Sequence, residues 1–147
     1  HALVHGHVLF FADCLAKLAE TPRAKVFTLL DSGSRAALNA LFARCGFSAP
    51  VRNLLARLVV HARTCDLADD IAARHYVVTL LIEELIGEHG GDIPPALDEA
   101  FAYLNGQNIA LARAAARGVM PAFAAEIPDA TMIPDLSEDR PLALPAA

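Results

Sequence analysis

Apolar residues are densest between Tyr76 and Ile86, in the run YVVTLLIEELI. A short apolar run can form a buried strand or a buried helix, so its flanking residues decide between the two. Upstream, the acidic cluster beginning at Asp66 is typical of a capped first turn of a helix, and downstream Gly87 and Gly90 favour a helix end. The pattern predicts one long helix near residues 67–88, apolar on nearly all sides and buried at the centre of a helical domain.

Elsewhere, apolar residues recur every three or four positions, which is the period of an amphipathic helix, and short clusters of Gly, Pro, Ser and Asp separate the segments. The helices predicted on this basis cover residues 3–19, 22–30, 35–45, 50–64, 94–104 and 109–117. Asn105-Gly106 is expected to separate the last two, and Thr21 to cap the second. The inward stripe expected for the first is Val8, Phe11, Leu15 and Leu18. With no alternating strand pattern, we expect an all-α domain, a compact bundle of about six to seven short helices around the central one.

Residues 127–147 differ in composition from the rest of the chain. They include the prolines Pro128, Pro134, Pro141 and Pro145 and scattered acidic residues. This composition predicts an extended or disordered tail, because it offers little to bury. We therefore expect a single helical domain over residues 1–126, followed by a Pro-rich acidic tail over residues 127–147.

Composition narrows the class of protein further. Hydrophobic residues make up 55% of the 147 residues, yet no uninterrupted apolar run approaches the roughly 18 residues of a membrane span, so we expect a soluble protein. Three cysteines, Cys14, Cys45 and Cys65, match no zinc or redox spacing, which favours reduced, mostly buried thiols in a cytoplasmic protein. The sequence begins at His1 without a signal-peptide pattern, and we expect it to be part of a longer chain.

The net charge of −5 conceals two halves of opposite sign. Residues 1–65 carry eight Lys/Arg against three Asp/Glu, a net charge of +5, whereas residues 66–147 carry four against fourteen, a net charge of −10. Either the two halves attract each other across an internal interface, or the basic half is free for an anionic partner. The first interpretation is the simpler one, because basic residues spaced along helices usually form solvated faces.

Residues 12–30 have the layout of a DNA-binding helix-turn-helix. Ala16 and Val26 occupy the positions where that motif has a small residue in its first helix and a β-branched residue in its second. Glu20 departs from the motif, because the turn usually has a glycine that adopts a positive φ without steric cost.

Four basic residues are the candidates for partner binding: Arg23, Lys25, Lys17 and Arg35. The apolar residues of the helix over residues 22–30 account for its packing, so Arg23 and Lys25 are expected to be free for a partner. In a helix-turn-helix they would face the phosphates or the groove of DNA. The acidic total charge argues against nucleic acid, so a protein partner is the main hypothesis and DNA the alternative.

The segment from Gly6 to Phe47 is similar to the C-terminal part of domain-of-unknown-function family 2336, a bacterial family. Its features are a glycine and paired aromatics before an Ala/Leu helix, a Pro-containing turn and a Leu-x-x-Leu-aromatic helix ending before a glycine. The residues that carry the likeness are Gly6, Phe10, Phe11, Leu15, Leu18, Pro22, Leu29, Leu30, Leu38, Leu41, Phe42 and Gly46. The family tends to have glycine where this chain has Glu20. The resemblance covers under a third of the chain and implies a helical, non-enzymatic role in the bacterial cytoplasm.

Histidines are the remaining candidate for chemistry. His1 and His5 are one helical turn apart, a spacing that can place two imidazoles on one metal ion, but no third ligand is evident. We therefore expect solvated histidines, with an adventitious metal site as the upper limit. His61 and His75 lie among apolar neighbours and are expected to be hydrogen-bonded core residues.

The sequence contains no glycine-rich phosphate loop, no Gly-x-Ser-x-Gly elbow and no Cys-His pair of recognisable spacing. We therefore predict no enzyme activity and no cofactor. The predicted function is a non-enzymatic helical interaction or regulatory module of the cytoplasm, and the alternative is a DNA-binding helix-turn-helix over residues 12–30. Both interpretations are compatible with a homo-oligomer.

Overall fold

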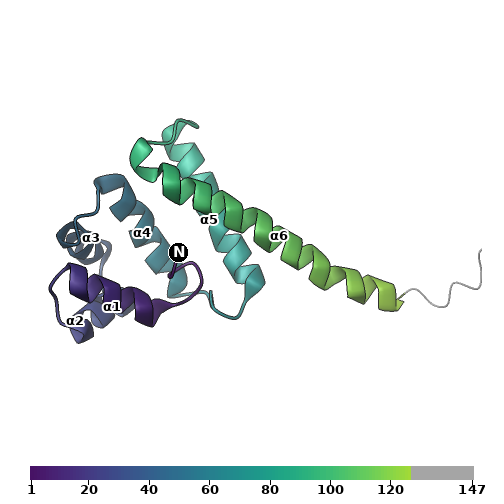
Figure 1. The fold of residues 1–147 in the computed structure, drawn as a ribbon, viewed down its shortest axis with the longest axis horizontal. Coiled ribbons are helices and arrows are strands. Elements are labelled where there is room, and N and C mark those ends of the chain that lie inside the picture. Colours follow the sequence, from purple (N-terminus) through teal and green to yellow (C-terminus); the bar gives the residue numbers. More distant parts are fainter. Residues whose placement is uncertain (127–147) are drawn as a thin grey trace, which may run out of the picture.

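The structure, a computed structural model, describes the backbone of residues 1–126 and the side chains of residues 1–117. Its helices are α1 (Val8–Leu18), α2 (Arg23–Ser32), α3 (Arg35–Arg44), α4 (Ala49–Ala62), α5 (Ile71–His89) and α6 (Asp98–Glu126), with a single 3-10 turn, η1 (Pro95–Leu97) (Figure 1). Residues 1–126 contain no strand, which confirms the all-α prediction. The tail predicted over residues 127–147 lies outside the described residues.

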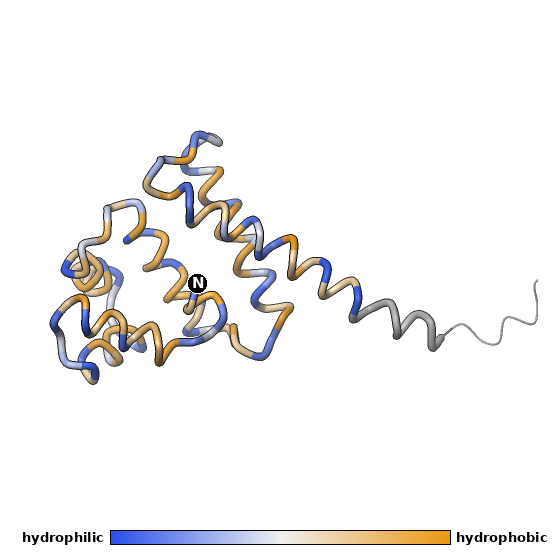
Figure 2. Tube along the Cα trace, viewed as in Figure 1, coloured by the Kyte–Doolittle hydropathy of each residue, from blue (hydrophilic) through white to orange (hydrophobic). Residues whose placement is uncertain are grey.

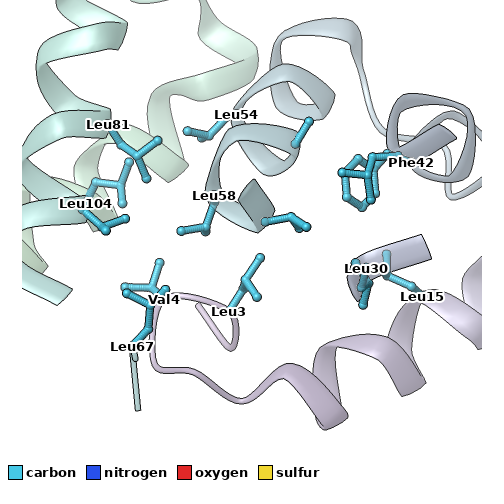
Figure 3. Close-up of a cluster of buried hydrophobic side chains, with 14 of the residues drawn as sticks. Leu3, Val4, Leu15, Leu30, Phe42, Leu54, Leu58, Leu67, Leu81 and Leu104 are labelled. Atoms are coloured by element: carbon cyan, nitrogen blue, oxygen red, sulfur yellow. The ribbon is translucent and has the colours of Figure 1, made fainter. Parts of the chain in front are cut away.

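The helices fall into two groups that share one core. Helices α1 to α4 gather on one side of the molecule, and α5 and α6 form a helical hairpin on the other (Figure 1). Helix α4 joins the groups: its Leu54 and Leu58 lie between Leu81 and Leu104 of the hairpin and Phe42 of α3 (Figure 3). These side chains belong to a single cluster of buried apolar residues, so the two groups form one packed unit.

Helix α5 is the predicted central helix, and it packs against both α4 and α6. Its buried residues are Val77, Val78, Leu81, Ile82 and Leu85. It begins at Ile71 rather than near residue 67, because Asp70 is the residue whose carboxylate accepts the N–H of Ala73, at 3.0 Å. Asp66 caps a separate turn before it. The expectation that this apolar helix is buried on nearly all sides was too broad, because Tyr76 is 64% exposed.

The predicted break at Asn105-Gly106 is wrong, because α6 runs through it. Asn105 donates its side-chain N–H to the carbonyl of Phe101 in the same helix, at 3.1 Å, so its amide does not compete for a turn. Gly106 is exposed and costs only about 1 kcal/mol of helix propensity. Leu104 and Leu111 are buried on either side of this glycine, and their packing holds the helix together.

The first helix begins at Val8 rather than at Leu3, and residues 1–7 form a series of turns. Leu3 and Val4 are nevertheless buried in the shared core. Gly6 has φ +72° and crosses close to the loop before α5: a Cβ on it would lie 2.6 Å from the backbone nitrogen of Ala68. Gly6 therefore lets the N-terminal segment leave the core and enter α1.

Candidate functional site

The α1–turn–α2 unit contains the two helices and the turn that were expected for residues 12–30. Val26 is fully buried and Ala16 packs against the core, so the two helices approach closely at the expected positions. Glu20 has φ 47° and is the one non-glycine residue of the described chain with a positive φ. The turn therefore adopts the left-handed conformation that glycine usually supplies, at a cost of about 1–2 kcal/mol. Thr21 does not cap α2, because its hydroxyl donates back to the carbonyl of Ala19 at 3.0 Å.

Arg23 is not free for a partner, contrary to the expectation from its helix pattern. Its Nε lies 2.6 Å from Oδ1 of Asp13, so the pair ties the start of α2 to α1. Both side chains are about half exposed, which limits the contribution of this ion pair to roughly 0.2–1 kcal/mol. Helix periodicity did not pair Arg23 with Asp13, because Asp13 lies ten residues earlier, on a different helix.

Lys17 and Lys25 are exposed, and neither forms a salt bridge within residues 1–117. Arg35 is also exposed, but it lies beyond the C-terminal end of α2, whereas Lys25 lies near its start. Arg35 lines a pocket between α3 and α4. The structure therefore leaves the two lysines on the α1–α2 unit and places Arg35 on a different surface. The four predicted cations do not form one site.

Three other arginines of the basic half are used inside the fold. Arg63 donates through Nε to the carbonyl of Leu30 at 2.7 Å, and through Nη2 to the carbonyls of Leu29 and Gly33 at 3.0 and 2.9 Å. Leu29 and Leu30 lie in the last turn of α2, and Gly33 is its C-cap. The backbone N–H of Gly33 reaches the carbonyl of Leu29, and the helix dipole favours a cation at this end. The guanidinium of Arg63, the C-cap residue of α4, thus holds the C-terminal end of α2.

Arg44 and Arg52 likewise donate to backbone carbonyls that follow the ends of helices. Arg44 donates through Nη2 to the carbonyl of Ala19, immediately after α1, at 2.9 Å. Arg52 donates through Nη1 to the carbonyl of Phe47, in the loop after α3, at 3.0 Å. Three of the eight Lys/Arg residues counted in residues 1–65 therefore donate to backbone carbonyls of the fold.

Arg57 forms the salt bridges that join the basic half to the acidic half within the described chain. Its Nη1 lies 3.3 Å from Oε2 of Glu84, and its Nη2 is paired with Oε1 of Glu88. The hydrogen bond to Glu88 is the main reason that the pKa of Arg57 is raised above its ordinary value. This α4–α5 contact supports the internal-interface interpretation of the charge division.

Helix α1 carries large apolar side chains on the face that the fold leaves open, along a helix that is hydrophobic for most of its length (Figure 2). Phe10 is 64% exposed and Leu18 is 57% exposed. With the half-buried Cys14 they are spaced at four-residue intervals, which aligns them along one side of the helix. We call Phe10, Cys14 and Leu18 the α1 ridge. Placing Leu18 in the inward stripe was wrong, because Ala12 and Leu15 face the core and Leu18 does not.

The histidines do not form the metal site that the spacing of His1 and His5 allowed. No helix holds them: His1 stacks on Tyr103 at 3.7 Å between ring centroids, and Nδ1 of His5 lies 3.5 Å from Nη1 of Arg74. Burial and the charge of Arg74 lower the pKa of His5. Within residues 1–117, no group of three His, Cys, Asp or Glu side chains could hold a metal ion.

His61 and His75 are half-buried, but their rings form no hydrogen bond within residues 1–117, so the prediction of hydrogen-bonded core histidines is wrong. The three cysteines carry free thiols and are half-buried rather than buried. Burial raises the pKa of the Cys45 thiol, which makes it less reactive rather than more.

A pocket of about 210 Å³ lies between the N-terminal segment, α2 and α4. Its walls are mainly apolar, and include Leu3, Phe27 and Val59. Arg63 lies at its edge, but two of its nitrogens are occupied by the carbonyls of α2. Asp31 is therefore the one charged lining residue of this pocket without a partner in the described chain. A single carboxylate is not enough to orient a substrate.

Comparison of the chain with protein-family models, curated protein sequences and solved structures gives no match. The resemblance of residues 6–47 to family 2336 therefore stays a prediction. In residues 1–126, no helix combines the length and the apolar composition needed to cross a membrane.

Proposed function

We propose that this chain is a non-enzymatic helical interaction module that binds a protein partner through α1. The observation that carries the proposal is the exposure of the α1 ridge, where Phe10 and Leu18 keep more than half of their surface in contact with solvent. Neighbouring exposed apolar side chains of this size mark protein interfaces, because covering them removes apolar surface from water. The proposal includes a role in the bacterial cytoplasm, which the resemblance of residues 6–47 to family 2336 supports.

The partner we propose is an amphipathic segment with apolar side chains and at least one acidic residue. Lys17 lies seven residues after Phe10, on the same exposed side of α1, and has no salt-bridge partner in residues 1–117. Asp13, the acidic residue of that side, is neutralised by Arg23. Within residues 1–117, the unpaired positive charges of the α1–α2 unit are therefore Lys17 and, on α2, Lys25, and its unpaired carboxylates are Glu20 and Asp31. The two lysines would mainly raise the association rate with an acidic partner.

The test is affinity capture from an extract of the producing cells, with three forms of the protein as bait. Wild type and Tyr76→Ser should retain the same proteins, because Tyr76 is as exposed as Phe10 but lies on α5. The double variant Phe10→Ser/Leu18→Ser should lose at least one of them, and that protein should carry an acidic, amphipathic segment. Identical retention by all three baits would contradict the proposal.

DNA binding is the second candidate, and the left-handed turn at Glu20 is the observation that favours it. The charge of the unit weighs against it: Asp13, Glu20 and Asp31 balance its three cations, so little counterion release would drive association. Retention on random duplex DNA, measured between about 50 and 200 mM salt, should be weak and should change little with salt. A steep negative salt slope that Lys25→Gln reduces would favour DNA instead.

A further inference from the structure

A second pocket, of about 110 Å³, lies between α3 and α4 and is lined by Arg35, Ala56, Arg57, Val60 and His61. Three of these five residues carry nitrogen donors, and none is acidic. The volume suits one small chemical group, because pockets for whole cofactors or drug-sized ligands are several times larger, about 300–1,000 Å³.

The donors come from two helices and differ in how they are held. Arg57 and His61 are four residues apart on α4, so their side chains leave the same side of the helix. Glu84 and Glu88 fix the guanidinium of Arg57, whose side chain is only 16% exposed. Arg35 enters from the first residue of α3, the positive end of that helix, and has no salt-bridge or hydrogen-bond partner in residues 1–117.

The remaining walls favour an anion that has a carbon stem. Val60 is 44% exposed at this pocket, and Ala56 lies one turn before it on α4. A carboxylate on methylene groups would place its oxygens against Arg35 and its carbons against Val60. Inorganic phosphate would leave the apolar wall uncovered, while a guanidinium fork matches a carboxylate through two parallel hydrogen bonds.

We propose that this pocket is a binding site for a carboxylate on a short apolar stem, with Arg35 as its main ligand. The carboxylate comes either from an acidic side chain of a protein partner or from a small organic acid. Because Glu84 and Glu88 already neutralise Arg57, one guanidinium supplies most of the net attraction. A free carboxylate should therefore bind with a dissociation constant on the order of 1–10 mM.

The test is an NMR titration of the isotope-labelled protein with butyrate, phosphate and chloride at constant ionic strength. Butyrate should cause saturable shifts of the amide signals of Arg35, Val60 and His61, phosphate should bind several-fold more weakly, and chloride should produce no saturable shift. Arg35→Gln should weaken butyrate binding by about tenfold or more. Lys25→Gln, which removes the same charge outside the pocket, should change it less than about twofold.

Non-saturating shifts, or equal binding by wild type and Arg35→Gln, would overturn the proposal. Affinity capture with Arg35→Gln as bait then identifies the source: loss of a retained protein assigns the carboxylate to that partner, and unchanged retention assigns it to a small organic acid. The titration needs no protein partner and does not involve the α1 ridge, so its result is independent of the proposed function.

Discussion

The α5–α6 hairpin and the α1–α2 unit are both helical pairs, but they use their apolar residues differently. In the hairpin, α5 places its core residues against both α4 and α6, and the hydroxyl of Thr79 donates to Oδ1 of Asn108 across the pair at 3.0 Å. In the α1–α2 unit, Ala12 and Leu15 face the core while Phe10 and Leu18 face solvent. The hairpin also exposes apolar side chains, namely Ile71, Tyr76, Ile86 and Ile109. In α1, by contrast, Phe10 and Leu18 lie along one side of the helix with Cys14 between them, and this is the surface that we propose a partner covers.

The largest expected effect lies at the core of α5. Leu81 is 0% exposed, so Leu81→Ala should lower the free energy of unfolding by roughly 2–5 kcal/mol through lost burial and a residual cavity. Ile86→Ala on the same helix is the control and should cost less, because Ile86 is 44% exposed. A denaturant titration measures both. A loss below about 1 kcal/mol for Leu81→Ala would mean that α5 is not central to the fold.

The second effect concerns the link from α4 to α2. Arg63→Ala removes the donor for three carbonyls at the end of α2 and should cost about 1–3 kcal/mol. Arg35→Ala is the matched control, because it removes an arginine without hydrogen-bond partners in residues 1–117 and should change stability by less than about 0.5 kcal/mol. Thermal unfolding of the two variants should therefore differ clearly. Equal melting temperatures would show that Arg63 does not hold α2 in place.

The third effect has the opposite sign and lies in the turn of the α1–α2 unit. Glu20→Gly should raise stability by about 0.5–1 kcal/mol, because glycine adopts φ 47° without a steric penalty and loses only part of that gain to greater freedom when unfolded. Lys17→Gly, inside α1, should instead lower stability by about 1 kcal/mol. Chemical denaturation distinguishes the two signs. A destabilising Glu20→Gly would mean that the turn is not strained as described.

The sequence predicted the helical class and the position of the most buried helix because both depend on local periodicity. It placed the start of α5 too early because Asp66 and Asp70 are both suitable cap residues, and only the packed structure selects between them. The break at Asn105-Gly106 was wrong because the pair is a strong local turn signal that packing around Leu104 and Leu111 overrides.

The candidate surfaces were harder to predict, because their determinants lie far apart in the sequence. Arg63 reaches carbonyls about thirty residues earlier, and Arg57 meets Glu84 and Glu88 about thirty residues later. A charge count therefore overstated the basic surface available to a partner. The α1 ridge was missed because α1 has apolar residues on two sides, and periodicity alone does not say which side faces the core.

Under the proposed function, the α1 ridge is open in the free protein and is covered when a partner binds. Hydroxyl-radical footprinting with mass spectrometry measures this directly, since side-chain oxidation follows solvent access. In the free protein Phe10 should be oxidised about as readily as Tyr76, which is equally exposed, and far more readily than the buried Phe42. Adding a protein retained in the affinity capture should protect Phe10 and leave Tyr76 unchanged. If Phe10 of the free protein were as protected from oxidation as Phe42 at every protein concentration, the ridge would not be open. That result would contradict the proposed function.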